Sequence, residues 1–134
     1  MDSINVTTEI LSLAEARRRL EVIKPEVERL MDLSRQIQQM HALLKGFSGS
    51  GKHPPLLTAG LERLRVAWRE SLQRINDQGA TVKDPATGLM DFYTWHGDEL
   101  VFLCWHHGEE TIEAWHGLDE GFAGRKSVES LREP

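Results

Sequence analysis

An alternating three-and-four spacing of apolar residues dominates the first third of the chain. Such a spacing, held for about four heptads, is typical of a long helix that packs against another helix. Ser12 and Glu15 have the S-x-x-E spacing of a capping box, which predicts that the helix begins there. Pro25 lies inside the repeat without changing its phase, so we expect one continuous, bent helix. The repeat comprises Leu13, Ala16, Leu20, Ile23, Val27, Leu30, Ser34, Ile37, His41 and Leu44.

A second amphipathic segment, residues 56–78, follows a connector at 46–55 that is rich in Gly, Ser and Pro and is predicted to be flexible. The two segments predict an antiparallel, coiled-coil-like helical hairpin over 12–78. Two helices alone leave much of their apolar surface half covered. We therefore expect the hairpin to pack on the C-terminal part of the chain, on a second copy of the chain, or on both.

The connector contains a near-match to the phosphate-binding loop G-x-x-x-x-G-K, at Gly46, Gly51 and Lys52. That loop requires a preceding strand, a following helix and a Ser or Thr that holds magnesium. Here a helix precedes, His53 replaces the hydroxyl residue, and two prolines without backbone N–H groups follow. We therefore expect no nucleotide to bind.

Strand-like runs make up the next part of the chain. Residues 89–95, 99–105 and 111–116 are predicted strands joined by hairpin-length connectors, and 81–83 is a further short strand. The run 99–105 is nearly all apolar, as in a central strand. These segments predict a three- or four-stranded antiparallel meander over 80–116. The whole chain, 1–134, is then a single α+β domain that ends in a Gly-rich tail at 117–134, frayed from 126 onward.

Composition limits the function classes. The net charge is -5 and the pI about 5.7, which argues against nucleic-acid binding through broad phosphate neutralisation. The basic run at 17–19 is interpreted as a solvated helix face. No apolar run approaches membrane-spanning length, no signal peptide is visible, and one cysteine cannot form an internal disulfide. We expect a cytoplasmic protein without a membrane partner.

The motifs of the chain resemble an uncharacterised bacterial family, domain of unknown function 2203. The resemblance covers nearly the whole chain, and its C-terminal motif is the more specific part. Leu11 stands where the family usually has Phe. The resemblance implies a bacterial cytosolic protein with a helical hairpin before a sheet, and it implies no activity. The matching segments are LSLAEA at 11–16, GLMDF at 88–92, CW at 104–105, GE at 108–109, WH at 115–116 and GFAGR at 121–125.

Five residues form a candidate polar site: Asp91, Glu109, His116, Asp119 and Arg125. A carboxylate can orient a histidine, and a guanidinium can bind an anion. The competing interpretation is that these groups pair with one another and fasten the Gly-rich loop 117–125 to the sheet.

The metal interpretation is weaker. His106, His116 and Glu109 are candidate ligands, but neither C-x-x-C nor H-E-x-x-H occurs. Pairing of the last two strands across the Gly108 turn predicts that His116 approaches the start of the central strand rather than Cys104. We therefore expect no cofactor, and we expect Cys104 to be a buried, inert thiol.

Two functions remain as hypotheses. The first is a non-enzymatic interaction module that forms a homo-oligomer, such as a homodimer, through the helical hairpin. The second is a small metal- or anion-dependent enzyme with a site around His116 at the sheet edge, which requires Glu109, His116 and Arg125 to converge on an open pocket. Trp95, Trp105 and Trp115 recur every ten residues, and a hydrophobic layer between sheet and hairpin is favoured over a ligand groove.

Overall fold

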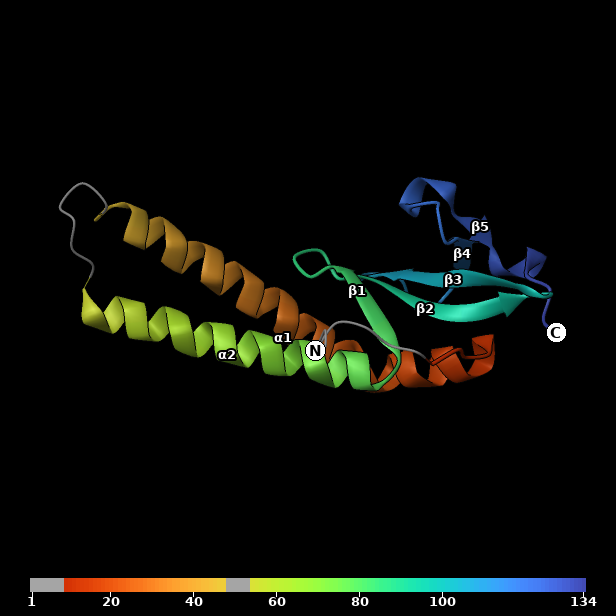
Figure 1. Ribbon diagram of the computed structural model, residues 1–134, viewed down its shortest axis with the longest axis horizontal. Helices are drawn as coiled ribbons and strands as arrows, with labels where there is room; N and C mark the ends of the chain where they lie inside the picture. Colours follow the sequence, from red (N-terminus) through yellow and green to blue (C-terminus); the bar gives the residue numbers. More distant parts are fainter. Residues whose placement is uncertain (1–8, 48–53) are drawn as a thin grey trace.

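A computed structural model describes residues 9–47 and 54–134. The chain begins with two antiparallel helices, α1 (Leu13–Lys45) and α2 (Pro55–Asp77), as the apolar repeat predicts (Figure 1). Ser12 is the N-cap of α1, and its hydroxyl accepts a hydrogen bond of 3.1 Å from the Glu15 backbone N–H. The helix continues through Pro25, so one continuous helix is confirmed.

The second half of the chain is a five-stranded antiparallel sheet in sequence order, with β3 at the centre. The α+β class, the hairpin and the antiparallel meander are therefore confirmed, but the sheet has five strands rather than the predicted three or four, because the tail adds the fifth. The strands of the sheet are β1 (Ala80–Asp84), β2 (Leu89–His96), β3 (Glu99–His106), β4 (Ala114–Gly117) and β5 (Lys126–Ser127).

The C-terminal tail is more ordered than the sequence predicts. Strand β5 pairs with β4 and is followed by a short 3₁₀-helix, Val128–Ser130. The Trp115 indole N–H donates to the Ser127 carbonyl at 3.1 Å and to the Ser130 hydroxyl at 3.0 Å. Val128 and Leu131 pack against the core. The prediction of fraying was wrong because a two-residue strand carries no periodic signal.

The core lies between the helices, mainly α1 with the end of α2, and one face of the sheet. Trp105 and Trp115 belong to it, as predicted, but Trp95 is 39% exposed. Alternation along β2 places Trp95 on the opposite face from Phe92, so the predicted three-tryptophan layer is wrong at this position. The central core residues are Ala16, Leu20, Ile23, Val27, Met90, Phe92, Leu103, Trp105 and Ile112.

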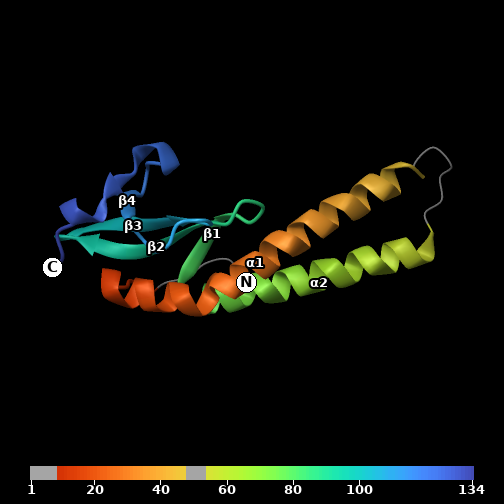
Figure 2. The same ribbon diagram turned by 180° about the vertical axis from the view of Figure 1, so that it is seen from behind.

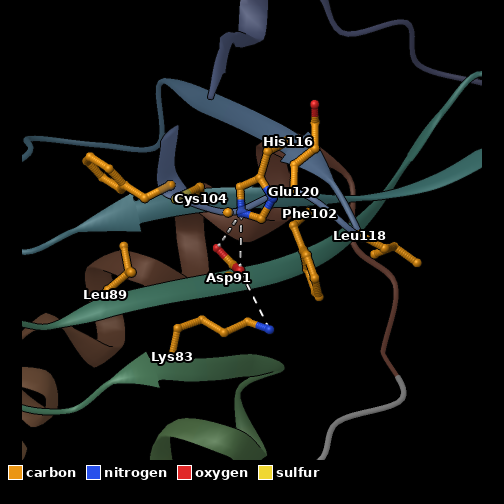
Figure 3. Close-up of a pocket in the computed structure, with 10 residues that line it drawn as sticks. Lys83, Leu89, Asp91, Phe102, Cys104, His116, Leu118 and Glu120 are labelled. Carbon is orange, nitrogen blue, oxygen red and sulfur yellow. Dashed lines mark hydrogen bonds and ion pairs between the residues drawn. The ribbon is translucent and has the colours of Figure 1, made fainter. Parts of the chain in front are cut away.

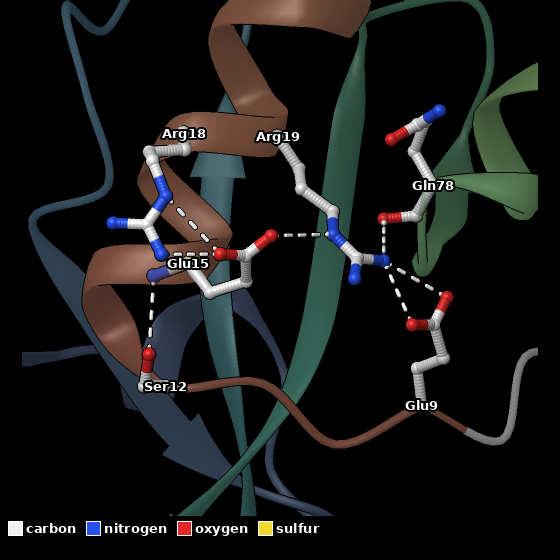
Figure 4. Close-up of polar contacts among 6 residues, drawn as sticks. All are labelled: Glu9, Ser12, Glu15, Arg18, Arg19 and Gln78. Atoms are coloured by element: carbon white, nitrogen blue, oxygen red, sulfur yellow. Dashed lines mark hydrogen bonds and ion pairs between the residues drawn. The ribbon is translucent and has the colours of Figure 1, made fainter.

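Arginines of the basic run fasten the first turns of α1. Arg19 binds Glu15 at 3.0 Å, both carboxylate oxygens of Glu9 at 2.8 and 2.9 Å, and the Gln78 carbonyl at 3.2 Å (Figure 4). Arg17 donates to the Ile112 carbonyl. The interpretation of a wholly solvated face was therefore wrong, because only Arg18 of the three is mostly exposed.

The hairpin extends well past the sheet (Figures 1 and 2). We call residues 34–47 and 54–70 the arm, and residues 9–33 and 71–134 the head. Within the described chain, no helix is long and apolar enough to span a membrane. Gly51 and Lys52 of the phosphate-loop near-match lie outside the described residues.

Candidate functional site

Three polar side chains meet on the face of the sheet that points away from α1. Asp91 on β2 lies directly opposite Cys104 on β3, and Cys104 lies opposite Ala114 on β4. His116 is two residues after Ala114, so it projects from the same face and lies diagonal to Cys104. Asp91, Cys104 and His116 are 2%, 1% and 3% exposed. We call these three residues the triad.

The donor atoms of the triad point toward one another (Figure 3). His116 Nε2 lies 3.4 Å from Asp91 Oδ1 and 3.3 Å from Oδ2, and one imidazole nitrogen, the Cys104 sulfur and one carboxylate oxygen all lie within 4.8 Å of one another. His116 Nδ1 lies 2.8 Å from the Gly117 carbonyl oxygen. Because a carbonyl only accepts, Nδ1 must carry a hydrogen, and the other ring nitrogen faces Asp91.

Burial disfavours negative charge in the triad. It raises the pKa of Asp91, against the opposing effects of the nearby His116 and Lys83 charges. Burial, followed by the charge of Asp91, raises the pKa of the Cys104 thiol to about 12. The thiol is therefore protonated at neutral pH, which agrees with the prediction of a buried, unreactive cysteine.

A pocket of about 230 Å³, partly open to solvent, lies over the triad. Phe102, Leu118 and Phe122 provide apolar walls. The Lys83 ammonium lies 3.9 Å from Asp91 Oδ2 and 4.4 Å from the centre of the Phe102 ring. The triad therefore combines buried donor atoms with access from solvent.

Glu120 also lines the pocket. Its carboxylate accepts from the Gly117 backbone N–H at 2.7 Å and from Lys126 at 2.8 Å, and these bonds lower its pKa. In Figure 3 the carboxylate points away from Asp91. Its contacts hold the loop, and it is not part of the triad.

The five predicted site residues do not meet in one place. Glu109 and Arg125 bind each other at 2.8 Å, and neither lines the pocket. Glu109 also accepts from the His106 backbone N–H at 2.8 Å, and Arg125 donates to the Cys104 carbonyl at 3.3 Å. Asp119 is exposed on the loop after β4. Asp91 and His116 are the two that lie together in the pocket.

The hydrogen bonds of Glu109, including the one with Arg125, favour its ionised form. Burial raises its pKa, but hydrogen bonds from Arg125 and from the His106 N–H outweigh burial, so the net pKa lies below the usual value. The Glu109 bond raises the pKa of Arg125. The geometry therefore matches the competing interpretation, in which this ion pair fastens the Gly-rich loop to β3.

The three residues predicted as metal ligands do not lie together either. His106 lies edge-on to the Phe122 ring, with ring centres 5.8 Å apart, and Glu109 is held by Arg125. Of the three candidates, only His116 lies beside other possible metal ligands, in the triad. The predicted register is confirmed, since Cys104 faces Ala114, but the inference that His116 stays away from Cys104 was wrong. Diagonal neighbours on one face of a sheet also come close, and that relation could have revealed the triad.

Comparisons with curated proteins and with solved structures found no match. A family model described as "Uncharacterized conserved protein (DUF2203)" matches residues 9–128. The match runs from the residues before α1 to the start of the last 3₁₀-helix, so it includes the hairpin, the whole sheet and the triad. The chain therefore belongs to the DUF2203 family.

Proposed function

We propose that this protein is a non-enzymatic interaction module of the cytoplasm that forms a homodimer through its arm. One observation carries the proposal. The apolar residues along which the two helices contact each other, which we call the seam, are buried beside the sheet but become partly exposed beyond its end. A free, buried Cys104 suits a reducing compartment.

The arm keeps an apolar seam without a third element to cover it. In α1 no residue after Leu33 is buried, and in α2 Leu61 is the one buried residue before Ser71. Six further apolar seam residues are partly exposed. They are Ile37, Met40 and Leu44 on α1, and Leu57, Leu64 and Trp68 on α2.

Polar contacts keep the two helices of the arm in register. The Trp68 indole N–H donates to the Ser34 hydroxyl at 2.9 Å, and Arg65 lies 3.3 Å from His41 Nε2. Ser34 and His41 occupy seam positions where an apolar residue would pack. A preformed pair of helices in fixed register is a surface on which a second pair can pack as a four-helix bundle.

Charge favours a second copy in antiparallel orientation. The arm has five basic and two acidic residues, a net charge of +3. The head has ten basic and eighteen acidic residues, a net charge of -8. Antiparallel arms keep the two acidic heads at opposite ends of the dimer and bring each basic arm toward the partner's head, whereas parallel arms would bring the heads together.

The hypothesis of an anion-dependent enzyme loses Arg125, the cation that it invoked. It requires Glu109, His116 and Arg125 to converge on an open pocket, but Arg125 is engaged by Glu109 outside the pocket. The self-association hypothesis requires only the exposed seam and the charge separation described above. For this reason we favour the interaction module.

Sedimentation velocity over a range of protein concentrations tests the proposal. We expect a concentration-dependent dimer that weakens with salt, because the arm and the head have opposite charge. Leu43 and Leu56 are 56% and 84% exposed near the tip of the arm. The substitutions L43E and L56E place negative charge near the partner's acidic head, and we expect each to raise the dimer Kd at least about tenfold.

Val22 supplies the matched control, because it is an exposed apolar residue of α1 that lies in the head and is 67% exposed. We expect V22E to leave the dimer Kd unchanged. A monomer at high micromolar concentration would refute the proposal. So would an equal effect of V22E and L43E, because it would show that the contact lies outside the arm.

A further inference from the structure

We infer that Asp91, Cys104 and His116 form a binding site for a divalent transition metal ion, with zinc as the best match. This site is separate from the proposed dimer contact, which lies on the arm. The inference depends on the donor set, its spacing, its outer contacts and its access to solvent.

The donor set suits a borderline-soft cation. The triad offers one thiolate, one imidazole and one carboxylate, which are the three side-chain classes that bind zinc. They come from three adjacent strands, β2, β3 and β4, which fix their directions. Magnesium and calcium prefer all-oxygen sites, so the sulfur and nitrogen donors disfavour both.

The spacing is close to that of a metal centre. Zinc bonds of about 2.0–2.3 Å in a tetrahedral arrangement place neighbouring donor atoms about 3.3–3.8 Å apart. His116 Nε2 and Asp91 Oδ2 are already 3.3 Å apart, and the widest separation in the set is at most 4.8 Å. Binding of one ion by all three atoms therefore requires only that the wider separations in the set shorten toward this range.

Hydrogen bonds around the triad help to orient two of the proposed ligands. Histidines that bind metals commonly donate their other ring N–H to a carbonyl or carboxylate, which fixes the tautomer. His116 Nδ1 is directed in this way at the Gly117 carbonyl at 2.8 Å. Arg125, itself held by Glu109, donates to the carbonyl of Cys104 and so supports the second ligand.

An ion pair alone does not account for the site. Pairing with His116 would compensate the charge of Asp91, and the Cys104 thiol also interacts with this carboxylate, but the ion pair does not explain why all three donor atoms lie within 4.8 Å of one another. It also gives no role to the pocket above the three groups. A bound cation would stabilise the Asp91 carboxylate and, by displacing the thiol proton, a Cys104 thiolate, and its fourth position would face the pocket of about 230 Å³.

Cobalt binding to the full chain, purified without an affinity tag, tests the inference. Co²⁺ substitutes for Zn²⁺ and gives a near-ultraviolet charge-transfer band when a thiolate binds it. Cys104 is the only cysteine, so such a band reports on this site alone. We expect one Co²⁺ per chain, with the band, and displacement by Zn²⁺.

Single substitutions test which side chains bind the ion. We expect C104S to lose the band, and H116N and D91N to weaken Co²⁺ binding by at least about tenfold. His106 lies on the same strand and face as Cys104 but outside the triad, so H106N is the matched control and is expected to bind as the unaltered chain does. Circular dichroism verifies that each variant is folded.

Two results would overturn the inference. One is a cobalt titration of the unaltered chain that yields no thiolate band, which is decisive even if a variant fails to fold. The other is equal loss of binding in H106N and H116N, because it would show that binding does not depend specifically on the buried triad.

Discussion

At the scale of single residues, Glu109 and Arg125 have a structural role that their residue types do not reveal. Acid and guanidinium side chains near a histidine suggest catalysis or anion binding, yet here each satisfies the other. Glu109 accepts from the backbone N–H of the last residue of β3, His106, while Arg125 donates to the Cys104 carbonyl. The pair joins the Gly-rich loop to the strand that carries Cys104.

The substitution E109Q is expected to lower the free energy of unfolding at neutral pH by about 1–3 kcal/mol, because a charge-assisted, partly buried hydrogen bond is lost. Glu109 has a folded-state pKa below its unfolded value. Its contribution is therefore present above the unfolded pKa of about 4.3 and is lost as pH falls through the folded pKa. Urea unfolding of the variant and of the unaltered protein, at pH 7 and at several values between about pH 5 and 3, measures how the difference in their free energy of unfolding depends on pH.

The difference between the variant and the unaltered protein should therefore shrink as the pH falls. E110Q is the matched control, because Glu110 is the next residue and is exposed. We expect it to leave the free energy of unfolding nearly unchanged. A difference for E109Q that does not depend on pH would show that the charge of Glu109 plays no part.

At the scale of elements, the C-terminal tail completes the head. Strand β5 pairs with the outer edge of β4, and β5 and the 3₁₀-helix after it each supply one acceptor of the Trp115 indole N–H. Without these residues, the indole would be buried without a hydrogen-bond acceptor, and Val128 and Leu131 would be lost from the core margin.

Truncation after Arg125 is expected to lower the free energy of unfolding by at least about 2 kcal/mol, from lost apolar burial and an unsatisfied indole. Denaturant unfolding monitored by tryptophan fluorescence measures the loss. Truncation after Arg132 keeps β5, Val128 and Leu131 and is the control. Equal stability of the two truncated proteins would show that the tail beyond Arg125 does not support the head.

At the scale of the whole molecule, the head and the arm differ in how they are stabilised. The head has a three-element core of α1, α2 and the sheet, with many residues below 2% exposure. The arm depends on a two-helix seam whose residues are mostly partly exposed. Local unfolding should therefore begin in the arm.

Hydrogen exchange measured by mass spectrometry tests this difference. We expect amides of the arm helices to exchange faster than amides of β2 and β3 in dilute protein, because fewer buried contacts oppose their opening. Raising the protein concentration should slow exchange in the arm and leave the centre of the sheet unchanged, because the proposed dimer buries the arm. Uniform exchange along the chain would contradict both expectations.

The sequence alone determined the elements of this protein. Leu13 to Leu44 carry a helical period, the S-x-x-E spacing marks the start of α1, and the apolar run of β3 marks the central strand. Each of these signals is local: it depends on residues a few positions apart, and the backbone geometry of helices and strands fixes which of them share a face. The order of the meander follows from the short connectors.

Only the tertiary structure decided which polar residues meet. Asp91, Cys104 and His116 are distant in sequence, and their meeting depends on the register of two strand pairs and on a diagonal relation across β3. Glu109 and Arg125 lie outside that group because they belong to two loops, between β3 and β4 and between β4 and β5, whose paths no periodic signal specifies. Shifting a strand by one residue would turn every side chain to the other face. The sequence therefore determined the helices and strands, while the register of the strands and the paths of the two loops determined which residues form the site.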